Sequence, residues 1–62
     1  MPLITIELPK TSNENKRKLV KQMAESTSQI LDVPLESIIT IIKENELENI
    51  GAGSNLMSEK LW

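Results

Sequence analysis

The sequence has no cysteine, no histidine and a single aromatic residue, Trp62. Without cysteine or histidine, neither a disulfide framework nor an ordinary zinc site can stabilise the chain. The net charge of −2 and the lack of aromatic rings leave no basic or stacking surface for nucleic acid. No apolar run approaches the roughly 18 residues that span a bilayer, and no signal peptide is recognisable at the amino terminus. We therefore expect a cytoplasmic protein that binds no cofactor, metal ion, nucleic acid or membrane.

The length of 62 residues allows one small domain, which we place at residues 1–62. A domain of this size buries only about 60% of the surface that its unfolded chain exposes, so burial has little to set against conformational entropy. Small proteins usually overcome this limit with disulfides, metal ions or partner subunits. Because 39% of the residues are hydrophobic and almost all of these are aliphatic, the sequence predicts a core shared between subunits.

Two segments have the pattern of β-strands. Residues 3–8 alternate in polarity, with Ile4, Ile6 and Leu8 on one face, which predicts a strand with one buried face. Pro9 ends this strand because proline cannot donate a hydrogen bond to the ladder. Residues 38–42 form a nearly continuous β-branched run, which is typical of a strand covered on both faces.

The segment between the two strands predicts a helix over residues 13–31. Thr11 and Glu14 fit the capping-box pattern, with Ser12 as a competing N-cap. Pro34 bars any continuation of the helix. The predicted apolar stripe consists of Leu19, Val20, Met23, Ala24, Thr27, Ile30 and Leu31.

The order strand, helix, strand with short links predicts an α/β fold, a β-α-β protomer with parallel strands and a right-handed crossover. The glycines within residues 50–54 predict a short C-terminal hairpin. One helix covers only one face of a two-stranded sheet, and both sheet edges stay free. Assembly of several copies would cover them. Four C-terminal residues are too apolar for a free tail and are expected to pack on a neighbouring subunit: Leu56, Met57, Leu61 and Trp62.

The inventory of reactive groups is small, because no histidine or cysteine can act as base or nucleophile. Glu44, Glu46 and Glu48 cluster in a polar segment that could bind a hard cation, and we interpret them as a solvated loop. The basic run 16–18, together with Lys21, could hold an anion, and we interpret it as a solvent-exposed helix face.

Pro2 offers a different chemistry. The small side chain at position two favours removal of Met1, which leaves a secondary amine at the start of a buried strand. Loss of solvation lowers the pKa of such an amine, and a base with a pKa near the operating pH can catalyse keto–enol tautomerisation. With Met1 attached, the Pro2 nitrogen is an amide and cannot act as a base. The alternative interpretation is that Pro2 only begins a strand.

Several motifs follow one another in a defined order. They are Pro2-Leu3-Ile4, Leu31-Asp32-Val33-Pro34-Leu35, Ile38 to Ile42 and Asn49-Ile50-Gly51-Ala52-Gly53. In this order and spacing the chain resembles the 4-oxalocrotonate tautomerase family over nearly its full length. The resemblance implies a β-α-β protomer that dimerises and usually assembles into hexamers. It also implies an amino-terminal proline as general base, in sites shared between subunits.

The chain departs from this family at the substrate-binding positions. Members that act on dicarboxylates carry one arginine before the helix and a second in the aliphatic strand, where this chain has Thr11 and Ile39. A family aromatic residue before the glycine turn is Ile50 here. Lys10 is the candidate replacement cation, although lysine lacks the planar bidentate grip of arginine. Lys43 is the second choice, and an exposed turn lysine is the alternative interpretation of Lys10.

Two functions stay open at this point. The first is a tautomerase-like isomerase that acts on a small carbonyl or keto-acid compound, with Pro2 as base and Lys10 stabilising negative charge on the substrate. Thr11, Ile39 and Ile50 would line its pocket. The second is an inactive family member that serves as an oligomeric binding or assembly module. Both predict a dimer-based homo-oligomer, expected to be a hexamer. A DNA-binding strand-helix protein is disfavoured because both strands are apolar.

Overall fold

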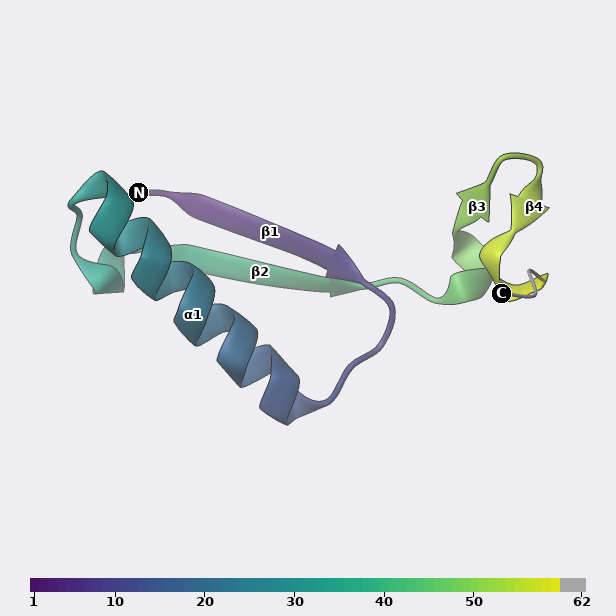
Figure 1. Cartoon of the computed structure of the whole chain (residues 1–62), viewed down its shortest axis with the longest axis horizontal. Helices are drawn as coiled ribbons and strands as arrows, with labels where there is room; N and C mark the ends of the chain where they lie inside the picture. The colour runs from purple at the N-terminus through teal and green to yellow at the C-terminus, as the bar shows by residue number, and fades with distance from the viewer. Residues whose placement is uncertain (60–62) are drawn as a thin grey trace.

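The computed structural model describes residues 1–59 and places one long helix along a two-stranded sheet (Figure 1). The sheet is parallel, with Leu3 beside Ile39 at one end and Leu8 beside Glu44 at the other. The β-α-β protomer with a C-terminal hairpin is thereby confirmed. In chain order the elements are β1 (Leu3–Leu8), α1 (Asn13–Leu31), η1 (Leu35–Ser37), β2 (Ile39–Glu44), η2 (Leu47–Asn49), β3 (Gly51–Ala52), β4 (Asn55–Leu56) and η3 (Met57–Glu59).

The two strands differ in how closely they match the sequence pattern. β1 spans the predicted residues, whereas β2 begins one residue later and ends two residues later than predicted. Lys43 and Glu44 therefore belong to the sheet, and the polar segment of Glu46 and Glu48, which we interpreted as a loop, contains the 3-10 turn η2. Parallel pairing with the whole of β1 carries β2 past its β-branched run, because each residue of β1 finds a partner.

The ends of α1 are determined by local hydrogen bonds. Ser12 is the N-cap, and its hydroxyl accepts the Asn15 N–H at 3.1 Å, so the competing cap forms and the Thr11 capping box does not. At the other end Asp32 adopts the left-handed conformation, with φ 55° and ψ 51°. The Val33 N–H then donates to the Ser28 carbonyl, which is the 6→1 bond of a Schellman motif.

The helix covers one face of the sheet and leaves the other open. The side chains that face α1 are half-buried, and they are Ile4, Ile6, Leu8, Thr40 and Ile42. On the outer face Leu3 is 58% exposed, Ile39 41% and Ile41 39%. Leu3, Ile39 and Ile41 form an aliphatic patch on this outer face without cover in the protomer, and Thr5, Glu7 and Lys43 make the rest of the face polar.

The protomer has very little core of its own. Within residues 1–59 only Ala24 and Ile38 are buried, and even these keep 9% exposure. The radius of gyration is 15.0 Å, whereas a compact domain of this length has about 10.6 Å. An extended protomer with so small a core is the shape expected of a subunit that completes its packing in an assembly.

The hairpin formed by β3 and β4 projects beyond the end of the sheet (Figure 1). Its two central residues are Gly53 and Ser54, and Gly53 has a φ of 63°. A positive φ at the first central position is the feature of a type II′ turn, which fits the twist of a two-residue hairpin. Leu56 is exposed on this hairpin and Met57 is half-buried beside it, whereas Leu61 and Trp62 lie outside the described residues.

Thr40 carries a buried hydroxyl that has no hydrogen-bond partner within residues 1–59. A hydroxyl that loses water without gaining a partner destabilises the folded state by about 1–3 kcal/mol. We expect Thr40→Val to raise the free energy of unfolding by about 1 kcal/mol, measured by urea denaturation. The matched Thr27→Val change should bring no gain, because the Thr27 hydroxyl donates to the Met23 carbonyl at 2.8 Å. A destabilised Thr40→Val variant would show that the Thr40 hydroxyl does have a hydrogen-bond partner in the folded protein.

Candidate active site

Pro2 lies where the sheet begins, next to the first residue of β2. The Ile39 N–H donates to the Pro2 carbonyl at 3.0 Å, which holds the proline against β2. Leu3 and Ile39 are register partners and place two exposed aliphatic side chains beside it. The structure thus brings together two of the predicted site residues, Pro2 and Ile39, in an apolar and accessible environment.

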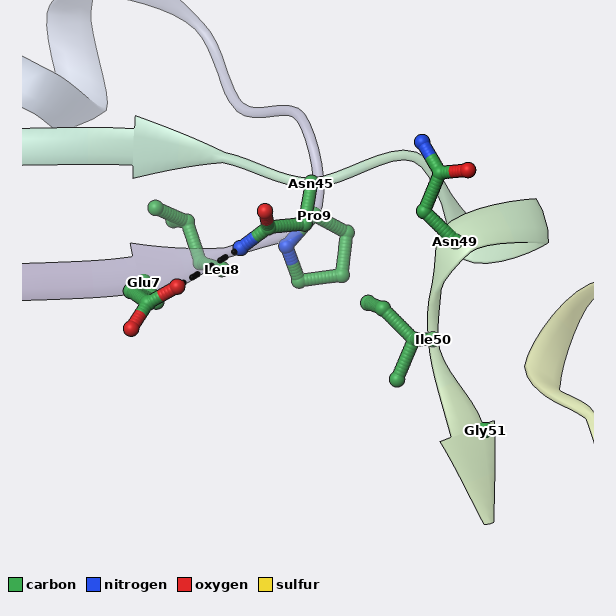
Figure 2. A pocket seen from close by; sticks show the side chains of 7 residues that line it. All are labelled: Glu7, Leu8, Pro9, Asn45, Asn49, Ile50 and Gly51. Carbon is green, nitrogen blue, oxygen red and sulfur yellow. Dashed lines mark hydrogen bonds between the residues drawn. The ribbon is translucent and has the colours of Figure 1, made fainter.

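A groove opens at the opposite end of the sheet, between the strand ends and the hairpin (Figure 2). It has a volume of about 470 Å³. In the close view the Ile50 side chain points toward Pro9 across the groove, while Asn45 and Glu7 form its polar side. The lining residues are Glu7, Leu8, Pro9, Asn45, Asn49, Ile50 and Gly51.

The two ends of the sheet are too far apart to form one site within a protomer. Pro2 and Pro9 are seven positions apart in the sequence, and an extended chain rises about 3.3 Å per residue, which gives a separation of roughly 23 Å. Ile50 lines the groove, and Lys10 and Thr11 follow Pro9 directly. The predicted site residues therefore fall into two groups at opposite ends of the protomer.

Asn45 fastens the groove to the end of β1. Its N–H donates to the Leu8 carbonyl at 2.8 Å, and its side-chain amide donates to Glu7 Oε1 at 3.2 Å. These two bonds continue the connection between β1 and the segment after β2 beyond the last register pair, Leu8 and Glu44. They anchor this side of the groove to β1, with a carboxylate and an amide as its polar groups.

Glu44 fastens the turn between β1 and α1. Its carboxylate accepts the Thr11 N–H at 3.1 Å and pairs with Lys16 Nζ at 3.1 Å. Both side chains of the pair are only 30% exposed. Lys16 therefore does not lie on a solvated helix face, and Glu44 does not lie in a solvated loop, which corrects both interpretations for these two residues.

A signal for these contacts was present in the sequence. Glu44 has the same strand parity as Thr40 and Ile42, so once the strand continues past Ile42 its side chain must face the helix.

Lys18, by contrast, forms an exposed i,i+4 pair with Glu14 at 3.8 Å and fits the solvated-face interpretation. No group of acidic residues within residues 1–59 is arranged to hold a metal ion.

Lys10 is exposed but engaged. Its Nζ lies 3.3 Å from Glu46 Oε1, and the two side chains are 74% and 54% exposed. The candidate cation is thus paired with a carboxylate on the segment after β2. Lys43, the second choice, lies across from Glu7 on the outer face of the sheet.

The hydrogen bond from Thr11 N–H, and after it the ion pair with Lys16, hold the pKa of the Glu44 carboxyl below its usual value of 4.5. A carboxyl whose pKa is lowered by folding stabilises the protein above its unfolded pKa, and this contribution is lost as the pH falls through the folded pKa. We expect Glu44→Gln to lower the melting temperature near pH 7 and to have less effect below pH 4, as measured by circular dichroism. Glu48→Gln is the charge-matched control. Equal pH profiles for the two variants would contradict this role of Glu44.

Comparison with known proteins shows which family this chain resembles. The profile of the Tautomerase enzyme family matches residues 2–60. A 2-hydroxymuconate tautomerase from Pseudomonas putida is 37% identical over 60 residues, which cover 95% of each chain. A second protein of that name from Pseudomonas putida is 35% identical over the same share.

Solved structures agree with the sequence matches. A 4-oxalocrotonate tautomerase homologue superposes with a TM-score of 0.90 and 30% identity over 100% of both chains. DmpI from Helicobacter pylori superposes with a TM-score of 0.85 and 27% identity, covering 95% of this chain and 100% of its own. The chain belongs to the tautomerase family, and the prediction of an isomerase of the 4-oxalocrotonate tautomerase kind is confirmed.

No helix within residues 1–59 is both long and apolar enough to cross a bilayer.

Proposed function

We propose that this chain, after removal of Met1, catalyses keto–enol tautomerisation of a small carbonyl or keto-acid compound with the Pro2 amine as general base. The observation that carries the proposal is the position of Pro2 at an open, apolar end of the sheet, where the Ile39 N–H fixes its carbonyl. A free amine at this accessible, apolar position can remove a proton from the enol hydroxyl and return it to carbon. The proposal retains the cytoplasm as the place of action.

A complete site requires a second copy of the chain. Pro2 and Ile39 lie at one end of the protomer, whereas Ile50, Lys10 and Thr11 lie near the groove at the other. Packing that covers the outer aliphatic face would let the Pro2 end of one copy meet the groove of another. We therefore propose a homo-oligomer built from dimers, with a hexamer as the expected state, in which each pocket uses residues of at least two copies.

The assay that tests the proposal compares two enols on the Met1-free protein. Phenylenolpyruvate carries one carboxylate, and 2-hydroxymuconate, for which the Pseudomonas putida relatives are named, carries two. Because Ile39 and Ile50 make the pocket apolar, we expect measurable ketonisation of both, with a gain in kcat/KM of less than about tenfold for the dicarboxylate, equivalent to about 1.4 kcal/mol. Ultraviolet absorbance follows either reaction. A preference of several hundredfold for the dicarboxylate would contradict this expectation and point to a further cation in the site besides Lys10.

A binding or assembly module without activity is the second candidate. The observation that favours it is the ion pair between Lys10 and Glu46, which leaves that cation occupied. Absence of ketonisation by a Met1-free protein that forms a stable oligomer in light scattering would decide for this alternative.

A further inference from the structure

We propose that Glu46 weakens the binding of anionic substrates at the site, because it pairs with Lys10 and competes with a substrate carboxylate for this cation. The inference rests on the proposed function, since it concerns the pocket to which Lys10 would contribute. It makes the discrimination against anionic substrates depend on a residue that does not contact the reacting atoms.

The ion pair lies beside the groove and joins its two walls. Lys10 directly follows Pro9, which lines one wall, and Glu46 directly follows Asn45, which lines the other. The bond from Asn45 N–H to the Leu8 carbonyl keeps these two walls in register. Lys10 and Glu46 are therefore positioned to meet each other whenever the groove is empty.

The exposure of the pair determines how strongly it competes. Lys10 is 74% exposed, so the pair is screened by water and holds the ammonium only weakly. A substrate carboxylate can displace Glu46 from Lys10. The two carboxylates compete for the same ammonium group and repel each other. The remaining partners in this region are more firmly engaged, because Lys16 and Glu44 are only 30% exposed. Replacing Glu46 with a neutral residue should therefore be enough to free Lys10.

The test uses Glu46→Gln with Glu48→Gln as a matched control. Both variants raise the net charge by one unit, but Glu48 has no ion pair within residues 1–59. The probes are adipate, a dicarboxylate, and adipamide, its neutral counterpart. Binding is followed by nuclear magnetic resonance through the amide shifts of residues 10–12, on the assembled Met1-free protein. We expect Glu46→Gln to bind adipate about two- to fivefold more tightly than wild type and adipamide equally well.

Two further arms separate the possible failures. In a Lys10→Ala background Glu46→Gln should bring no gain, and a gain there would show that Glu46 acts by repulsion alone, which overturns the inference. Equal adipate affinities of Glu46→Gln and Glu48→Gln, or no adipate binding by either, would overturn it as well.

Kinetics with 2-hydroxymuconate and phenylenolpyruvate then test the function itself. With the proposal correct, Glu46→Gln raises kcat/KM for the dicarboxylate more than for the monocarboxylate. A wild-type protein that ketonises neither enol contradicts the proposed function, whereas the adipate measurements still decide the role of Glu46.

Discussion

A form of the protein that keeps Met1 is expected to have no tautomerase activity. The Pro2 nitrogen is then part of a peptide bond, which has no basic lone pair for a proton. Positioned general bases contribute about 10²- to 10⁴-fold to rate, so loss of the free amine should remove at least 10²-fold in kcat. Intact mass determines whether Met1 is present, and the phenylenolpyruvate assay measures the rate on the same sample.

The Pro2→Ala variant tests whether activity needs the secondary amine of proline or only an amine at this position. After Met1 removal it retains a nitrogen at the same place, but this is a primary amine on a less rigid residue. We expect activity between that of wild type and the Met1-bearing form, with an unchanged melting temperature. Full activity of the Met1-bearing form would show that another residue is the base.

The second large effect is expected from Ile41→Asp on the outer face of the sheet. Ile41 is 39% exposed in the protomer and lies among Leu3 and Ile39 in the aliphatic surface that assembly would cover. An unpaired carboxylate buried at a subunit interface costs about 3–5 kcal/mol. We expect light scattering to show loss of the oligomer.

Loss of assembly should also unfold the chain, because within residues 1–59 the protomer buries only Ala24 and Ile38. Circular dichroism should therefore show loss of helix together with the fall in mass. Gln22→Glu places the same charge on an exposed part of α1 and should leave both properties unchanged. An Ile41→Asp variant that stays oligomeric would place the interface elsewhere.

Local sequence determined most of the secondary structure. The alternation in residues 3–8 predicted β1, and the apolar spacing between Ser12 and Pro34 predicted α1, because strand and helix periodicity repeat within a few residues. The shortage of core material was also visible, since length and composition limit what one copy can bury. The family assignment depended on the order of short motifs around Pro2, the Asp-x-Pro turn and the Gly-x-Gly turn.

Only the tertiary structure decided the electrostatic partners and the division of the site. Thr11 and Glu44 are 33 positions apart, and their contact exists because the parallel register places the end of β2 beside the turn into α1. The same register brings Lys10 to Glu46 and separates Pro2 from the groove by the length of β1. Polarity patterns report which face of a strand is buried. They do not report which charged side chains meet, because that depends on how distant segments align.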